Sequence, residues 1–304
     1  MTGRGHRATG FGLLWRADLP LAEFAEADDL SSPARAADVD VHRVSSLAER
    51  HPGRTVNRGS VHPDGIRLGW NREVTFDMFD GAHIHYLPGE HWKGSLPSCF
   101  YSTIAALTLA WRGSVPLHAS AIEFEGRAFA IAGASGAGKS SLAAGLIALG
   151  GSLVADDLTV IRAVPGRAPE VFPGRPAMRQ HPGTAAITTS ESSEAIPGDP
   201  RQKWLVRPRA RSARASLPLG GILLLGSGEK EQDSPGKVAS LASNLFRPRW
   251  LAALPNYASL RHDLLAIASA VPIQSLPAIG IFSPLAQLRR AEEALSAIRA
   301  MRPR

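Results

Sequence analysis

Apolar residues recur at every second position through much of residues 1–112, which predicts a β-rich N-terminal part. The alternation is clearest over 66–70 and 74–78, and an imperfect version covers 39–44. The pair Asp80-Gly81 follows the second of these runs and precedes another apolar stretch, which is typical of a tight hairpin. We therefore expect antiparallel strands in this region.

Other stretches of this part lack a period of two. Residues 1–9 are polar and predicted to be irregular, and Phe11–Trp15 is the first expected strand. Asp28–Ala36 is a second polar stretch. Apolar spacing then predicts a helix from about Pro97 to Trp111.

The centre of the chain predicts a βαβ unit. The apolar run Phe129–Ala132 reads as a buried strand, and Ser141–Leu149 is rich in good helix formers. A second strand through Leu153 and Val154 ends at the acidic pair 156–157. Alternating strands and helices of this kind favour an α/β fold.

The loop of this unit, Gly133–Ser140, fits the pattern G-x-x-x-x-G-K-[ST] at every fixed position. Its glycines allow a tight turn whose N–H groups point at phosphate oxygens. Lys139 can reach the β- and γ-phosphates, and the Ser140 hydroxyl can bind Mg²⁺. Asp156 and Asp157 are expected to face the same crevice from the end of the neighbouring strand. The alternative is an ordinary glycine-rich turn before a helix.

The residues before this unit place a histidine near it. Leu117–Phe124 is expected to be one strand, and Glu125-Gly126 turns it back into the strand that precedes the loop. His118 would then lie beside the phosphate-binding loop, where either a catalytic or a structural role is open.

Residues 163–216 form a Pro- and Arg-rich stretch that is predicted to be a long loop. Its basic residues favour either a solvated loop or a mobile flap that brings a cation onto a transferring phosphate. They are Lys203, Arg207, Arg209, Arg211 and Arg214. The rest of the expected kinase domain, 113–304, includes a strand at Gly221–Leu225, a helix at Tyr257–Ala270 and a helix that begins at the Ser283-Pro284 pair.

Composition narrows the class of protein. The 304 residues are 44% hydrophobic and 20% charged, as in globular proteins, and the net charge is +7. A basic balance suits a nucleotide or an acidic peptide, and no Lys/Arg run with interleaved aromatics supports nucleic-acid binding. Cys99 is the single cysteine, so no internal disulfide can form. No apolar run approaches the length of a membrane span, so we expect a cytoplasmic protein. The oligomeric state is left open.

His83, His85 and His91 are a conceivable metal site in the N-terminal part. No carboxylate or cysteine at ligand spacing supports it, so a solvated strand face is the preferred interpretation.

The run from Leu117 to Ile161, LHASAI followed by GRAFAIAGASGAGKSSLAAGLIALGGSLVADDLTVI, resembles the catalytic domain of HPr kinase/phosphorylase. It resembles more closely the HPr-kinase-related serine kinases of lasso-peptide biosynthesis. The resemblance is strong over about 115–162 and looser elsewhere. It implies an HPr-kinase-like phosphate-loop kinase core with ATP and Mg²⁺ as cofactors.

Carried over to this chain, the resemblance implies a role for each residue of the motifs. Ser140 and Asp156 would hold Mg²⁺, Asp157 would take the proton from a substrate serine, and His118 would assist near the γ-phosphate. Lys139 would neutralise the triphosphate. The triphosphate-binding residues would be Gly133, Ala134, Ser135, Gly136, Ala137, Gly138, Lys139, Ser140 and Ser141.

The expected function is an ATP-dependent serine kinase acting on a peptide or protein, with the C-terminal serine of a lasso precursor as the leading substrate. The alternatives are an HPr(Ser) kinase-like regulator, a small-molecule kinase and a non-catalytic nucleotide sensor.

Overall fold

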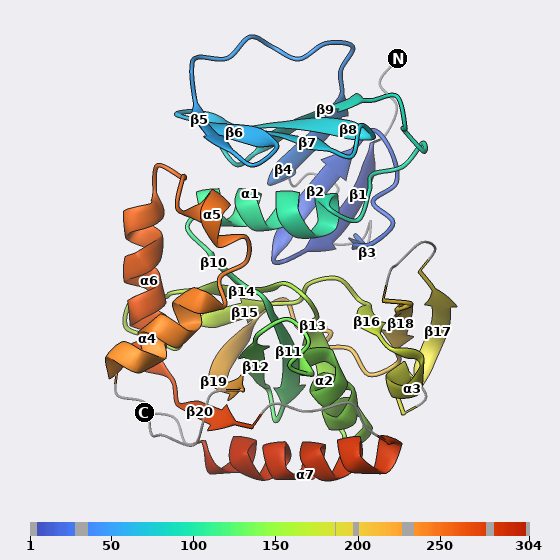
Figure 1. The fold of residues 1–304 in the computed structure, drawn as a ribbon, viewed down its shortest axis with the longest axis vertical. Coiled ribbons are helices and arrows are strands. Elements are labelled where there is room, and N and C mark those ends of the chain that lie inside the picture. Colours follow the sequence, from blue (N-terminus) through green and yellow to red (C-terminus); the bar gives the residue numbers. More distant parts are fainter. Residues whose placement is uncertain are drawn as a thin grey trace. The chain divides into compact units, whose positions relative to one another are not determined.

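The computed structural model describes residues 5–27, 36–185, 187–196, 201–226, 234–277 and 283–301. The fold is α/β with mixed sheets (Figure 1). The chain divides into two compact units, of which the first contains Met1–Ser114 and Arg247–Leu260 and the second contains Val115–Phe246 and Arg261–Arg304. The predicted polar stretch Asp28–Ala36 lies outside the described residues except for its last residue.

The first unit is built on a nine-stranded sheet of order β3-β1-β2-β4-β9-β8-β7-β6-β5. Its helical elements are the π-helical turn η1 (Phe100–Ile104), α1 (Ala105–Trp111), α5 (Pro248–Leu251) and the start of α6 (Tyr257–Ala270). Its strands are β1 (His6–Gly10), β2 (Leu13–Ala17), β3 (Ala25–Glu26), β4 (Val39–Arg43), β5 (Arg54–Val56), β6 (Gly59–His62), β7 (Gly65–Trp70), β8 (Val74–Phe79) and β9 (His83–Pro88).

The expected strands over 39–44, 66–70 and 74–78 are confirmed, as is the antiparallel β8–β9 hairpin. The prediction that 1–9 is irregular is wrong, because β1 begins at His6. The strand expected at Phe11–Trp15 begins at Leu13 instead, as β2. Phe11 and Gly12 have φ of 55° and 76° and form the turn between β1 and β2. Two successive residues with positive φ are what a two-residue hairpin requires.

A buried ion cluster crosses the sheet of the first unit. The Asp77 carboxylate has Oδ1 2.7 Å from Arg50 Nη2 and Oδ2 2.6 Å from Arg67 Nη2. The side chains of Asp77 and Arg50 are 1% and 2% exposed. Arg50 also contacts Asp64 Oδ1 and the carbonyl of Met78 at 2.7 Å, and its guanidinium lies over the ring of Phe79. Asp77 thus neutralises Arg50, which has almost no access to water, and Arg67, whose side chain is 27% exposed.

The second unit has an eight-stranded sheet of order β10-β14-β15-β19-β12-β11-β13, with β20 paired to β19. Its strands are β10 (Val115–Leu117), β11 (Ala119–Phe124), β12 (Arg127–Gly133), β13 (Ser152–Ala155), β14 (Thr159–Arg162), β15 (Glu170–Phe172), β19 (Leu217–Leu225) and β20 (Ile273–Leu276). A separate three-stranded sheet has the order β16-β18-β17 and consists of β16 (Met178–Gln180), β17 (Ser190–Ala195) and β18 (Trp204–Pro208).

Helices complete the second unit. They are α2 (Lys139–Ala148), α3 (Pro182–Ala185), α4 (Ser234–Ser243), the remainder of α6 and α7 (Pro284–Ala300). In Figure 1, the lower end of α2 meets α7, which crosses below it, and α2 packs on β11 and β12. The helices approach closely at Gly145, where an added Cβ would lie 2.7 Å from the Cβ of Ala291. Ser283 caps α7 as expected, because its Oγ accepts a hydrogen bond from Ala286 N.

Two expectations about the second unit are wrong. Leu117–Phe124 is not one strand, because β10 ends at Leu117, β11 begins at Ala119, and they pair with different strands. The strands of the predicted βαβ unit are not neighbours either, since β11 lies between β12 and β13 and is antiparallel to both. The turn at 125–126 folds β12 back along β11, so β11 occupies one edge of β12. The strand that follows α2, β13, therefore pairs with β11 and not with β12.

The expectation that 163–216 is a long loop is also wrong. The segment contains β15, the three-stranded sheet and α3. These strands have three to six residues each, and Pro, Gly and Arg between them hide the short runs of alternation.

The ion cluster generates a prediction for stability. Asp77→Ala would leave Arg50 and Arg67 without their shared counter-ion, and we expect a loss of about 3–5 kcal/mol in the free energy of unfolding. Denaturant unfolding followed by circular dichroism measures it. Glu90→Ala is the matched control, because Glu90 pairs with Arg72 through side chains that are more than half exposed. Equal stabilities of the two variants would contradict the prediction.

Candidate functional site

A glycine-rich loop, Gly133–Gly138, joins the end of β12 to the start of α2. Gly133, Gly136 and Gly138 have φ of 155°, 88° and 92°, in the range that favours glycine. A Cβ on Gly133 would also lie 2.8 Å from the carbonyl oxygen of Leu225. The backbone therefore needs glycine here. The loop leads into the first turn of α2, whose N–H groups have no intrahelical acceptor and carry partial positive charge.

Lys139 is enclosed by this loop. Its Nζ donates to the carbonyl oxygens of Gly133, at 2.8 Å, and Ala134, at 3.1 Å, and the residue is 7% exposed. Burial lowers the pKa of Lys139 from its ordinary value of 10.5, against the opposing effect of the Asp156 and Asp157 carboxylates. The positive charge of Lys203 lowers it further. The ammonium thus lies in a partly desolvated place where an anion would stabilise it.

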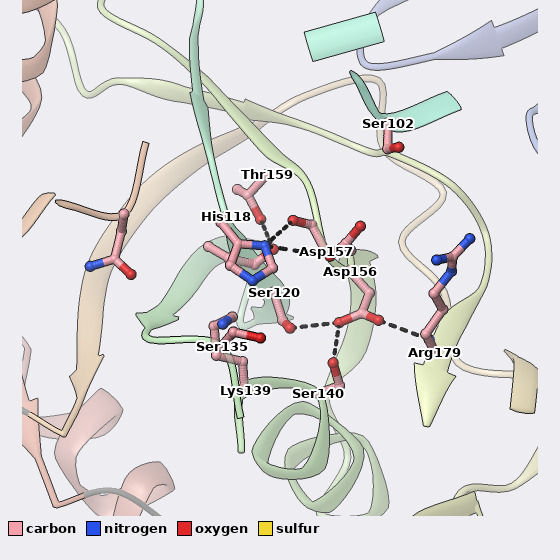
Figure 2. A network of polar contacts seen from close by, with 12 residues as sticks. Ser102, His118, Ser120, Ser135, Lys139, Ser140, Asp156, Asp157, Thr159 and Arg179 are labelled. Carbon is pink, nitrogen blue, oxygen red and sulfur yellow. Dashed lines mark hydrogen bonds and ion pairs between the residues drawn. The ribbon is translucent and has the colours of Figure 1, made fainter. Parts of the chain in front are cut away.

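Asp156 binds three different segments (Figure 2). Its Oδ1 accepts from Ser140 Oγ at 2.8 Å and from Ser120 Oγ at 2.7 Å, and its Oδ2 accepts from the backbone N–H of Arg179 at 2.9 Å. The residue is 2% exposed. The carboxylate is therefore held in one orientation by β11, the start of α2 and β16.

Asp157 points to other partners. Its φ of 68° turns the backbone just after β13, and Figure 2 shows its carboxylate directed toward His118 while that of Asp156 is directed toward Ser120 and Ser140. His118 Nδ1 lies 3.0 Å from the carbonyl oxygen of Asp157 and 3.4 Å from its Oδ1. Arg175 Nη2 lies 3.7 Å from Asp157 Oδ2. Adjacent acidic residues thus supply two separate carboxylate positions.

The structure brings most of the predicted site residues together. Ser140 contacts Asp156, His118 contacts Asp157, and Lys139 binds the loop carbonyls. Of the remaining predicted residues, Ala134, Gly136, Ala137 and Gly138 belong to the loop itself, which a hydrogen bond from Ala137 N to Ala134 O closes at 3.1 Å. The Ser135 hydroxyl accepts from Arg201 Nη1 at 3.3 Å. Ser141 lies apart from them, because its hydroxyl is 3.4 Å from Thr184 Oγ1 on α3.

The basic side chains of residues 203–214 have different partners and do not gather at one place. Arg211 makes two contacts to Glu191, at 2.8 and 3.0 Å, and Arg214 Nε contacts Glu123 at 3.0 Å. These pairs compete with any binding of phosphate. Lys203 is the member of the stretch whose charge acts on Lys139.

Three further residues contact the predicted site residues and were not predicted from the sequence: Ser120, Arg175 and Asn244. Ser120 lies two residues after His118, and the period of a strand could have placed both on one face of the sheet. Arg175 lay within the segment expected to be a loop. Asn244 follows α4, and its Oδ1 accepts from the backbone N–H of Gly133 at 2.8 Å. No local pattern signals this contact across 111 residues.

Comparison with protein-family models gave no match, and comparison with curated proteins gave none either. Within the part of the chain that the structure describes, no helix has the length and apolarity needed to cross a membrane.

The surroundings of Lys139 generate a prediction about its titration. Since the Asp156 carboxylate raises the pKa of Lys139 against burial, Asp156→Asn should lower that pKa further. NMR titration of the Lys139 side-chain ε-carbon measures the change. Glu123→Gln is the control, because it removes a carboxylate that pairs with Arg214. It should leave the pKa of Lys139 unchanged.

The sign of the effect on stability follows from the same shift. Between the lowered pKa and 10.5 the unfolded chain binds more protons at Lys139 than the folded chain does, so the free energy of unfolding should rise with pH in that window. Lys139→Met removes the titrating group, and an unchanged pH slope in this variant would contradict the assignment.

Proposed function

We propose that this chain is an ATP-dependent serine kinase that phosphorylates a peptide or protein. The observation that carries the proposal is the pairing of Ser140 with Asp156 at the head of α2, directly beside a second carboxylate, Asp157, that faces His118. A phosphoryl transferase needs a cation-binding position and a proton acceptor next to each other, and these two carboxylates match that need. The C-terminal serine of a lasso precursor is the leading substrate, on the resemblance drawn from the sequence.

The residues present fit a bound nucleotide with Mg²⁺. Ser140 Oγ and Asp156 Oδ1 lie 2.8 Å apart. Adjacent ligands of an octahedral Mg²⁺ with bonds of about 2.0–2.1 Å are separated by about 2.9 Å, so the two oxygens suit neighbouring positions. When bound, Mg²⁺ would neutralise charge on the phosphates. Asp156 keeps its orientation through Ser120 and the Arg179 N–H.

Lys139 and the loop would hold the phosphates. The first-turn N–H groups of α2 and the glycine-rich backbone favour anionic oxygens at this point. A phosphate would replace the Gly133 and Ala134 carbonyls as acceptors for the Lys139 ammonium, and the ion pair would relieve the cost of its burial. The alternative of an ordinary glycine-rich turn offers no reason for a lysine to be enclosed in this way.

Asp157 is the proposed general base. As the substrate serine oxygen forms its bond to the γ-phosphorus, the bond from that phosphorus to the oxygen of the departing ADP breaks, and the serine proton passes to Asp157. Arg175 Nη2, 3.7 Å from Oδ2, would help to hold the Asp157 carboxylate, while His118 Nδ1 bonds to the main-chain carbonyl of Asp157 at 3.0 Å and lies 3.4 Å from Oδ1. Because Nδ1 is engaged there, Nε2 is the His118 atom that would face the γ-phosphate. A kinase that consumes ATP acts where ATP is abundant, which favours the cytoplasm.

The division of roles between the two aspartates gives the central prediction. Asp157→Asn removes the proton acceptor and keeps the shape, and Asn tolerates the positive φ of 68°. We expect kcat to fall by roughly 10²–10⁴, the usual contribution of a positioned base, with ATP affinity nearly unchanged. Asp156→Asn should instead raise the Mg²⁺ concentration needed for half-maximal rate. Steady-state phosphorylation of a serine-ended peptide, followed by mass spectrometry across a Mg²⁺ series, measures both. The reverse pattern would exchange the two roles.

Lys139→Ala tests the phosphate-binding assignment separately. We expect loss of turnover and weaker ATP binding by calorimetry, because the ammonium enclosed by the glycine-rich loop is lost. Arg289→Ala, which removes an exposed cation on α7 of the same unit, is the matched control for loss of a positive charge. A Lys139→Ala protein that phosphorylates at the wild-type rate would refute the site.

A further inference from the structure

The segment Asn244–Phe246, which follows α4, runs beside the residues that carry His118. The carbonyl of Asn244 accepts from His118 N at 2.7 Å, and Phe246 N donates to the Pro116 carbonyl at 2.9 Å. Leu245 forms an isolated antiparallel bridge with Leu117. The ring of Phe246 lies 6.0 Å from the His118 imidazole. This segment therefore fixes the backbone of His118 at the break between β10 and β11.

The side chain of Asn244 reaches in the other direction, to the glycine-rich loop. Its Oδ1 accepts from Gly133 N at 2.8 Å, and its Nδ2 donates to the Ser240 carbonyl at 2.8 Å. A backbone N–H on one side and a carbonyl on the other determine which amide atom faces which partner. An aliphatic side chain at this position could neither accept from Gly133 N nor donate to the Ser240 carbonyl. An aspartate could accept from Gly133 N, but its second oxygen would repel the Ser240 carbonyl oxygen.

We infer that Asn244 is a positioning residue that fixes the start of the glycine-rich loop against His118. The inference about catalysis rests on the proposed kinase function. One residue binds the first loop residue through its side chain and His118 through its main chain, so the spacing between phosphate and imidazole depends on it. Displacement of a reacting group by about 1 Å can cost roughly 10² in rate.

Asn244→Ala removes the bond to the loop and keeps the main-chain bond to His118. We expect kcat at saturating ATP to fall about 10–100-fold, with the KM for the peptide unchanged, because the loop can bind nucleotide but presents it in the wrong place. Ser243→Ala is the matched control. Its exposed hydroxyl donates to the Ser240 carbonyl at the same helix end and lies 3.4 Å from Asn244 Nδ2, so its loss removes a weak contact of the Asn244 amide but neither the bond to Gly133 nor the bond to His118. Wild-type kcat in Asn244→Ala would overturn the inference.

A second readout does not require kinase activity. Hydrogen exchange of the Gly133 amide, followed by NMR on the full chain, should be slow in the wild type and in Ser243→Ala and at least tenfold faster in Asn244→Ala. If the wild type phosphorylates no peptide but Gly133 shows this pattern, the proposed function fails and the positioning contact is supported. If Asn244→Ala only melts at a lower temperature, with Gly133 exchange and kcat unchanged below melting, Asn244 is structural and the inference is wrong.

Discussion

The carboxylate of Asp156 is the interaction on which the candidate site depends. Its two oxygens accept hydrogen bonds from Ser120 on β11, Ser140 on α2 and the Arg179 backbone on β16. Each donor comes from a different element, so one buried side chain sets the distances among sheet, helix and the smaller sheet. Charge-assisted bonds of this kind are stronger than neutral ones, and a buried carboxylate without donors would be costly. The proposed function gives this same carboxylate the cation as well, so loss of Asp156 should disturb geometry as well as charge.

The turn at Asp157 gives two adjacent carboxylates different partners. Side chains alternate along a strand, and a regular β13 would have sent the two carboxylates to opposite faces. The strand ends at Ala155, and Asp157 then takes a left-handed conformation in which its carboxylate faces His118 while that of Asp156 faces Ser120 and Ser140. A non-glycine residue in this conformation is uncommon, although Asp accepts it more readily than most. Local backbone strain here coincides with the place where chemistry is proposed.

Much of the fold and the site could be predicted because the signals are local. The strands 65–70 and 74–79, the helices at 257–270 and 284–300, and the pairing of motif residues all follow from periodicity, caps and spacing. The position of β11 between β12 and β13 could not be predicted from the sequence, because the order of strands along the chain does not determine which strands pair. The short strands of 163–216 were missed because strands of three to six residues give too few alternations to show a period. Asn244 and Arg175 reach the site through tertiary contacts that leave no trace in nearby residues.

The division of the chain has a consequence for how its parts can be separated. The second unit is discontinuous, since residues 247–260 belong to the first unit and both flanking segments belong to the second. The boundary between Leu260 and Arg261 falls inside α6. Truncation of the chain after Ser114 would therefore leave residues 247–260 attached to the second unit but without the rest of the first unit. Buried apolar side chains such as Trp250 and Leu251 would then be exposed to water. To express the second unit alone, residues 247–260 should be replaced by a short linker. A protein obtained by simple truncation should be prone to aggregation.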